Sequence, residues 1–257
     1  MLTICAALWA PVGAWARSPV VVELFTAQGC SSCGKANAYI ARLADRAGVV
    51  ALTWSVDYWD YLGWKDTFAE PEFADRQRAY DKRFGLRDVY TPQVIVDGAA
   101  QVSGAQSASV DALIGEARRA RLPRPAMEMR QDGRIAVGTG RRPPGGGDVW
   151  LIRFDPREED IAVTEGDNRG TTVPQRNVVR QLARLGAWSG RPVSFKLPPA
   201  SDEGLATLIL VQADHGRRIL GVLEIGPPRA KEAAGSRGEP QNAKPPAAGG
   251  GRPRGAF

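Results

Sequence analysis

Two cysteines separated by two serines are the residues of this sequence best suited to chemistry. The tetrapeptide Cys30-Ser31-Ser32-Cys33 directly follows an apolar run, 20–25, and directly precedes a helical pattern. A strand followed by a helix that opens with Cys-x-x-Cys is typical of thiol–disulfide exchange. Free backbone N–H groups at a helix N-terminus favour a thiolate over a thiol. We therefore expect Cys30 to be an exposed nucleophile at the helix start and Cys33 to be the resolving thiol.

Other interpretations of this pair follow from its surroundings. A static local disulfide without turnover is the first alternative. Gly34 follows the second cysteine, so the c-type haem pattern fails, and two cysteines are too few ligands for a zinc site. A copper(I) carrier that uses the two thiolates alone is the remaining metal alternative. We expect no bound cofactor and no metal site. His215 is the only histidine, which leaves histidine-dependent hydrolase schemes without a base.

Glu23 is a carboxylate inside the otherwise apolar run 20–25. One interpretation makes it a buried proton acceptor for the resolving thiol, because burial raises the pKa of carboxylates. The other makes it the partner of an arginine such as Arg42 or Arg46. Both interpretations remain open at the level of sequence.

The segment 54–64 holds three tryptophans and two tyrosines. Because it follows the second apolar run, it could form a docking surface at the active-site end of a sheet. We favour packing in the core or between two domains, which is the more common use of such aromatic groups. Three aspartates in and next to this segment are expected to be turn and cap residues: Asp57, Asp60 and Asp66.

The elements that must position these residues alternate between strands and helices. Apolar runs predict strands at 20–25, 49–54 and 94–98, with a hairpin partner at 102–104. Helical spacing predicts helices at 33–46 and 71–84, and a third one that Ser109 caps and that ends before Pro123. This order predicts an α/β layered sheet over residues 17–122.

The prolines of Pro123-Arg124-Pro125 mark a boundary, because they cannot continue a helix. Beyond it, short strands around turns predict a smaller, mainly antiparallel β domain at 126–225. Its clearest strands are 149–154, 205–212 and 219–225. The run 176–182 is either a short helix or an amphipathic strand.

The two ends of the chain differ from the rest in composition. Residues 1–16 are nearly all apolar and end in Ala14-Trp15-Ala16, which predicts a signal peptide, too short for a stable membrane span, and a periplasmic or secreted protein. Its removal would take Cys5 with it. Residues 226–257 are rich in Gly, Pro and Ala and predict a disordered tail. The tail holds six basic and two acidic residues, so +4 of the net charge of +6 lies there. The nearly balanced remainder does not predict nucleic-acid binding.

Several spaced motifs resemble one family of proteins. They are 22–26 with Gln28-Gly29-Cys30-Ser31-Ser32-Cys33, then 56–66, Tyr90-Thr91-Pro92-Gln93, and 165–168 with 177–180. In these motifs the chain is similar to the secreted thioredoxin-like proteins of domain-of-unknown-function family 1223. The family tends to have a histidine where this chain has Ser55 and a proline where it has Gly34.

The resemblance implies a thioredoxin-like domain followed by the β domain. It also implies that Pro92 is cis and faces the dithiol. The expected function is that of an exported thiol–disulfide oxidoreductase that acts on protein thiols through Cys30 and Cys33. Its rival is a non-catalytic binding module in which the bridge only stiffens a loop.

Overall fold

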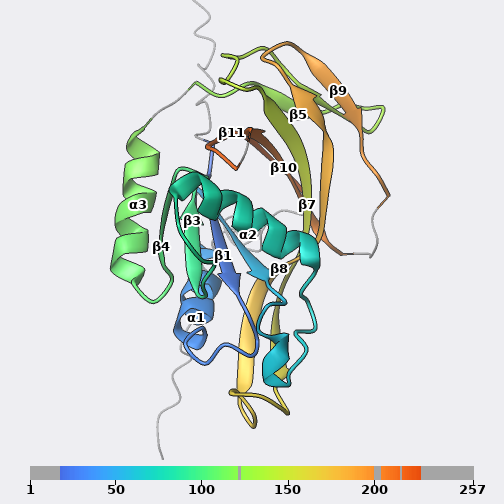
Figure 1. The fold of residues 1–257 in the computed structure, drawn as a ribbon. Coiled ribbons are helices and arrows are strands. Elements are labelled where there is room, and N and C mark those ends of the chain that lie inside the picture. The colour runs from blue at the N-terminus through green and yellow to red at the C-terminus, as the bar shows by residue number, and fades with distance from the viewer. Residues whose placement is uncertain (1–17, 121–122, 200–203, 215, 227–257) are drawn as a thin grey trace, which may run out of the picture. The chain divides into compact units, whose positions relative to one another are not determined.

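A computed structural model describes residues 18–120, 123–199, 204–214 and 216–226 of the chain (Figure 1). The predicted signal peptide with Cys5, the tail beyond Gly226, and His215 lie outside the described residues. Within the described ranges, no helix is both long and apolar enough to cross a membrane.

An eight-stranded sheet with the order β11-β10-β7-β8-β2-β1-β3-β4 is the centre of the fold. The first part of the chain contributes four strands, β1 (Val20–Thr26), β2 (Val49–Ser55), β3 (Gln93–Val96) and β4 (Ala100–Ser103). The later part contributes the other four, β7 (Gly147–Ala162), β8 (Thr172–Trp188), β10 (Ala206–Ala213) and β11 (Ile219–Ile225). A smaller antiparallel sheet has the order β5-β6-β9, with β5 (Met127–Met129), β6 (Arg134–Val137) and β9 (Val193–Lys196).

The pairing confirms the predicted α/β class with an antiparallel β-rich second part. β1 and β2 run parallel through seven residue pairs, while β1 with β3 and β7 with β8 are antiparallel. β8 lies parallel to β2, and the register joins the two strands at Thr53 and Val178. The large sheet therefore continues from the first part of the chain into the part beyond Pro125.

Helices cover both faces of the strands β1 to β3. α1 (Gly34–Leu43) and α3 (Ser107–Arg119) pack on one face, and α2 (Pro71–Phe84) packs on the other. α2 has its proline in the first turn and ends at Gly85, whose φ of 70° suits glycine. α3 starts two residues before the predicted cap at Ser109, and no side chain caps it. A 3-10 turn, η1 (Asp60–Leu62), follows β2.

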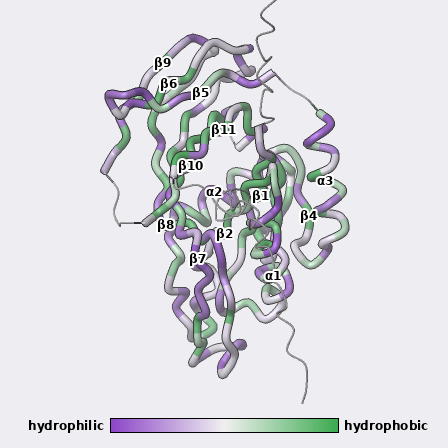
Figure 2. The backbone as a smooth tube through the Cα atoms, turned by 180° about the vertical axis from the view of Figure 1, so that it is seen from behind, coloured by the Kyte–Doolittle hydropathy of each residue, from purple (hydrophilic) through white to green (hydrophobic). Residues whose placement is uncertain are grey.

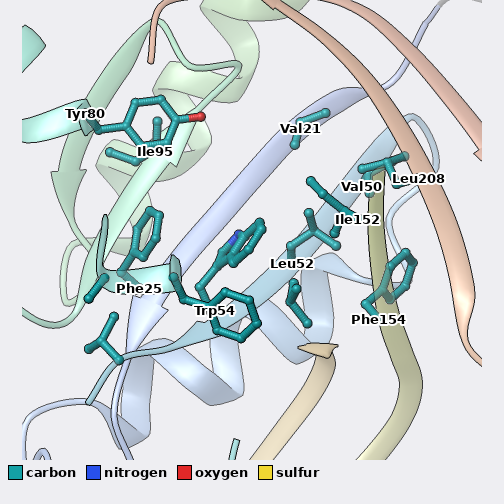
Figure 3. Close-up of a cluster of buried hydrophobic side chains, with 14 of the residues drawn as sticks. Val21, Phe25, Val50, Leu52, Trp54, Tyr80, Ile95, Ile152, Phe154 and Leu208 are labelled. Atoms are coloured by element: carbon teal, nitrogen blue, oxygen red, sulfur yellow. The ribbon is translucent and has the colours of Figure 1, made fainter. Parts of the chain in front are cut away.

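Alternating side chains of β1 define two hydrophobic layers. Val20, Val22 and Leu24 face α1 and α3, while Val21 and Phe25 face α2. The second layer extends across β2 to β7 and β10, as Figure 3 shows for Phe25, Trp54, Ile152 and others. Both cysteines of the tetrapeptide belong to it. A third cluster joins the small sheet to β7, β8 and β10.

β7 and β8 are 16 and 17 residues long, much longer than the predicted strands. The run 176–182 is strand throughout. Charged residues interrupt the apolar pattern of these strands, and the purple stretches of their hairpin in Figure 2 mark them. Opposite charges on the two strands compensate, because Glu159 of β7 forms an ion pair with Arg180 of β8.

Candidate functional site

Cys30 and Cys33 form a disulfide, with their Cα atoms 5.4 Å apart. Cys33 is the N-cap residue of α1, and its N–H donates to the Cys30 carbonyl at 3.1 Å. Cys30 therefore lies in the turn before the helix, three residues before the N-cap, whereas we expected it at the helix start. The expectation of an exposed Cys30 is wrong as well, because its exposed fraction is 3%, against 1% for Cys33. Ser31 and Ser32 between them are exposed.

Pro92 lies beside the first turn of α1. The Thr91–Pro92 bond is cis, as the resemblance implied. A Cβ atom at Gly104 would lie only 3.0 Å from the Cβ atoms of both Ala36 and Pro92. Glycine at this position therefore allows the Pro92 loop to approach α1 three residues after the second cysteine. The Pro92 carbonyl accepts the Gly104 N–H at 2.8 Å.

A buried polar chain from α2 holds the Pro92 loop on both sides. Gln77 donates to the Tyr90 carbonyl at 2.9 Å and to Gln93 Oε1 at 2.8 Å. Gln93 in turn donates to Asp81 Oδ1 at 2.7 Å, and the Tyr58 hydroxyl donates to Gln77 Oε1 at 3.1 Å. These bonds hold the Tyr90 carbonyl and the Gln93 side chain, on the two sides of the Thr91–Pro92 bond.

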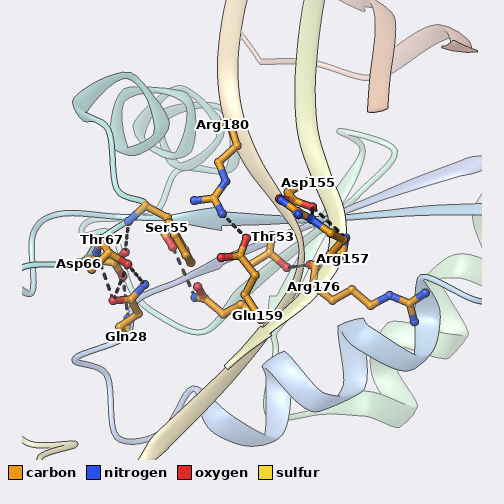
Figure 4. Close-up of polar contacts among 12 residues, drawn as sticks. Gln28, Thr53, Ser55, Asp66, Thr67, Asp155, Arg157, Glu159, Arg176 and Arg180 are labelled. Carbon is orange, nitrogen blue, oxygen red and sulfur yellow. Dashed lines mark hydrogen bonds and ion pairs between the residues drawn. The ribbon is translucent and has the colours of Figure 1, made fainter. Parts of the chain in front are cut away.

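Gln28 lies two residues before the first cysteine and is fully buried. Both of its backbone polar groups and both polar atoms of its side chain form hydrogen bonds. Its N–H donates to Asp66 Oδ2 at 2.7 Å, and its carbonyl accepts Asn168 Nδ2 at 2.6 Å. Its side chain accepts from Trp64 Nε1 at 2.9 Å and donates to Thr67 Oγ1 at 2.8 Å. Figure 4 shows Gln28 next to Asp66 and Thr67, with dashed lines for the hydrogen bonds among them. Gln28 therefore anchors the loop that carries the disulfide.

The loop between β7 and β8 forms one wall of this site. Asn168 binds the Gln28 carbonyl from this loop. A Cβ atom at Gly166, where φ is +71°, would lie 3.3 Å from the Leu62 carbonyl oxygen and 3.4 Å from the Trp64 Cβ atom. Glycine thus permits the loop to pack closely on the last residue of η1 and on the segment after it. This packing gives the motif 165–168 a structural role at the disulfide loop.

Asp66 is the buried carboxylate next to this anchor. Its oxygens accept the N–H groups of Gln28 and Phe68 at 2.7 and 3.0 Å. Burial raises its pKa to about 6, although these bonds and a hydrogen bond with Ser55 act in the opposite direction. Ser55, where the resembling family tends to have histidine, also lies 3.4 Å from Gln175 Nε2. Our expectation of a turn residue missed this burial.

Glu23 is buried and pairs with an arginine, as one interpretation predicted, but the arginine is Arg76 and not Arg42 or Arg46. Its Oε1 accepts from Arg76 Nε at 2.7 Å, and its Oε2 accepts from the Tyr80 hydroxyl. Its position in β1 places it on the face that α2 covers. The two arginines that we considered belong to α1 and the segment after it, on the other face.

The aromatic residues of the segment 54–64 differ in their surroundings: some pack in the core and others lie at the surface. Trp54 is fully buried in the layer that contains the disulfide, and Figure 3 shows it beside Phe25. Trp59 is half-buried and donates from Nε1 to Thr91 Oγ1 at 2.7 Å. Tyr61 is 79% exposed and stacks on Trp59. Core packing is therefore correct for Trp54, while Tyr61 lies at the surface.

These observations define a mixed α/β protein with a Cys-x-x-Cys disulfide at the start of a helix and a β hairpin against the disulfide loop. The chain belongs to the family DUF1223, described as a protein of unknown function, whose sequence profile matches residues 21–212. Among curated proteins, none matches the chain.

Two solved structures are similar to this one. The crystal structure of protein AGR_C_4864 from Agrobacterium tumefaciens is 30% identical, with a TM-score of 0.65 over 81% of this chain and 94% of that chain. HBP35 of Porphyromonas gingivalis is 12% identical, with a TM-score of 0.48 over 91% of this chain and 80% of that one.

Proposed function

We propose that this protein is a thioredoxin-like thiol–disulfide oxidoreductase that acts on protein thiols through Cys30 and Cys33. The disulfide in the turn before α1, with Cys33 as the N-cap residue, is the observation that carries this proposal. Its surroundings agree with the proposal, because Pro92 lies beside the same helix turn and Gln28 anchors the loop. The predicted signal peptide adds a periplasmic or secreted location to the proposal.

The exchange proceeds through a mixed disulfide. A substrate thiolate attacks Cys30 Sγ, the Cys30–Cys33 bond breaks, and Cys33 leaves as a thiolate. A second substrate thiolate then attacks the substrate sulfur of the mixed disulfide and releases Cys30 as a thiolate. Two substrate thiols become a disulfide, the protein disulfide becomes a dithiol, and the two protons of the substrate thiols are transferred. The same steps in reverse reduce a substrate disulfide.

The helix start supports the assignment of Cys33 as the leaving thiolate in this direction. An N-cap residue lies next to the N–H groups of the first helical turn, which have no partner inside the helix. Those N–H groups and the helix dipole stabilise negative charge at this position. Asn37 N–H donates to the Cys33 carbonyl at 3.0 Å and fixes the residue on the helix.

Two carboxylates are candidates for the proton acceptor. Glu23 is the weaker one, because its ion pair with Arg76 and its hydrogen bond with Tyr80 join it to α2 rather than to the disulfide loop. Asp66 touches the disulfide loop directly, and its pKa of about 6 suits proton transfer near neutral pH. We therefore propose Asp66 as the proton acceptor that serves the dithiol. Pro92 shapes the approach of the substrate to the disulfide.

The trapping variant Cys33→Ala tests the proposal. Without the second thiol, a mixed disulfide formed at Cys30 cannot be resolved from within the protein. We expect covalent adducts with cysteine-containing proteins of its own compartment, visible on non-reducing gels and lost on reduction. The matched control Cys30→Ala leaves only Cys33, which is the leaving thiolate of this scheme and not the attacked cysteine, and should trap far fewer adducts. Equal trapping by the two variants would contradict the assignment of roles.

The burial of both sulfurs favours one competing function, a binding module with a structural bridge. A redox titration of the wild-type protein against glutathione separates the two. A reduction potential below about −300 mV together with no exchange with thiols would identify a structural bridge. A copper(I) carrier would rest on two thiolates alone, since in the described part of the chain no group of three His, Cys, Asp or Glu residues could hold a metal.

A further inference from the structure

Tyr61 is the most exposed large hydrophobic side chain among the described residues, at 79%. A single exposed aromatic side chain on a protein surface needs no special explanation. Tyr61 is not isolated, however. Its ring stacks on Trp59, with centroids 6.5 Å apart and planes inclined by 16°. The two rings form a platform, which we call the Trp59–Tyr61 platform.

The platform is tied to both loops of the disulfide site. Trp59 Nε1 donates to Thr91 Oγ1 at 2.7 Å, next to the proline that lies beside α1. The Trp59 Cβ atom is 4.0 Å from the position that a Cβ atom of Gly29 would occupy, next to the first cysteine. Trp59 also packs against the hydrophobic cluster that contains both cysteines. Figure 1 shows η1 next to the loop between β1 and α1.

The charged residues of the stretch 57–64, which contains the platform, are both acidic. Asp57 and Asp60 are half-buried and flank Trp59 in the sequence, and within the described residues neither forms an ion pair. Asp60 uses Oδ1 to accept the Asp66 N–H at 3.1 Å. The basic residue of this segment is Lys65, which is exposed. Stacked aromatic faces with nearby carboxylates attract a cation, and arginine more than lysine because its planar guanidinium stacks on the rings.

We infer that the Trp59–Tyr61 platform binds an arginine side chain next to the reacting cysteine of a substrate protein. The inference rests on the proposed function and adds the substrate class. Trp59 lies against the turn at Gly29, next to Cys30, and hydrogen-bonds Thr91, next to Pro92. The residues next to a substrate cysteine that is bonded to Cys30 are therefore within reach of the platform. The negative charges of Asp57 and Asp60 favour a basic residue over an apolar one next to the substrate cysteine.

The test uses the oxidised full-length protein and three reduced peptides, acetyl-Gly-X-Cys-X-Gly-amide with X as Arg, Ser or Glu. Stopped-flow tryptophan fluorescence gives the rate at which each peptide thiolate opens the protein disulfide. Each rate is divided by that of the same peptide with oxidised glutathione, which removes differences in intrinsic thiol reactivity. We expect a normalised preference for Arg over Ser of about fivefold, with Glu slowest, and a weaker preference at high salt.

Variants assign the preference to the platform. Tyr61→Ala should reduce the Arg-to-Ser ratio to below about twofold, while Tyr61→Phe retains it because the ring remains. Asp57→Asn should reduce it in part. Met129→Ala removes the other strongly exposed hydrophobic side chain, which lies in the smaller sheet, and serves as the matched control. The reduction potential of Tyr61→Ala should equal that of the wild type, which separates binding from damage to the disulfide.

Two outcomes would overturn the inference, and they differ in what else they affect. Equal normalised rates for the three peptides, or a preference that survives Tyr61→Ala, would exclude the platform and leave the proposed function in place. A disulfide that reacts with none of the peptides would exclude the proposed function and the inference with it.

Discussion

At the disulfide, the helix start that holds Cys33 is formed by residues close to it in the sequence. The loop that carries the disulfide is held by residues that are far away in the sequence. The helical pattern immediately after Cys33 places this cysteine at the helix start, and this position could be predicted from the sequence. Gln28 belongs to a family motif, but its anchoring role could not be predicted, because its partners Asp66 and Asn168 lie 38 and 140 residues away. A glutamine in a loop carries no signal of its own before those partners are known.

Asp66 gives the protein a stability that depends on pH. Its pKa is raised from 3.8 to about 6, so between these values the folded state holds a proton that the unfolded state has lost. The stabilisation is full below pH 3.8 and is lost as the pH rises through 6. We expect Asp66 to lower the free energy of unfolding by on the order of 2–3 kcal/mol between pH 4 and pH 7.

Urea unfolding of the wild type and Asp66→Asn at several pH values measures this effect. The variant is expected to show a flatter pH dependence over this range, whatever its absolute stability, because asparagine does not titrate. Carbon-13 NMR of the wild-type carboxyl should give a midpoint near pH 6. Parallel pH profiles for the two proteins would show that Asp66 does not titrate in this range.

Among the elements, the β7–β8 hairpin is the one whose role at the site was hardest to predict. Its strands contain charged stretches that shorten the apparent apolar runs, so their true length depends on cross-strand pairs such as Glu159 with Arg180. The first three helices and strands were predicted close to their observed bounds, because each has a continuous apolar pattern and a local stop signal such as Gly85.

The contact of the hairpin with the disulfide loop can be removed with one substitution. Asn168→Ala leaves the buried Gln28 carbonyl without its donor and should cost about 1–3 kcal/mol of stability. Amide hydrogen exchange of Gly29 and Cys30 is expected to accelerate more than that of β1. Arg169→Ala, at the next and exposed position, is the matched control. Unchanged exchange in the disulfide loop would show that the hairpin does not restrain it.

α2 is joined to β1 by the buried ion pair of Arg76 with Glu23. Arg76→Met should cost about 3–5 kcal/mol, because it leaves a buried carboxylate without its cation. The double variant Glu23→Leu, Arg76→Met should be more stable than the single one in urea unfolding. Arg78→Met on the exposed side of the same helix, where the pair with Asp75 is in solvent, should cost less than about 1 kcal/mol. A double variant less stable than Arg76→Met would contradict this account.

At the scale of the molecule, one sheet spans the two parts that the sequence suggested as separate domains. The composition changes at Pro123-Arg124-Pro125, but β8 lies beside β2 and the large sheet continues. The α/β class followed from the order of the elements, whereas the pairing of β8 with β2 has no local sequence signal. Asn177 Nδ2 binds the Ala51 carbonyl and Thr53 Oγ1 binds the Arg176 carbonyl across this junction.

We expect residues 18–226 to unfold in one cooperative transition. Loss of the second part would leave β2 as an open edge and remove the apolar contacts of Ile152 and Leu208 with the central layer. Differential scanning calorimetry measures this through the ratio of the van't Hoff to the calorimetric enthalpy, which should be close to one. Two resolved transitions would instead indicate two independently stable domains.

The pairing of β2 with β8 also determines when the large sheet can be completed during synthesis of the chain. The hydroxyl of Thr53 finds its acceptor 123 residues further along, so at about 5–20 residues per second roughly 6–25 s pass before the ribosome has made it. During that interval one side of β2 has no neighbour and is open to any other strand. Of its seven residues only Thr53 and Ser55 are polar and none is charged, so this open edge is of the kind that pairs with other chains. The late pairing with β8 thus leaves the first part of the chain prone to aggregation until the second part is complete.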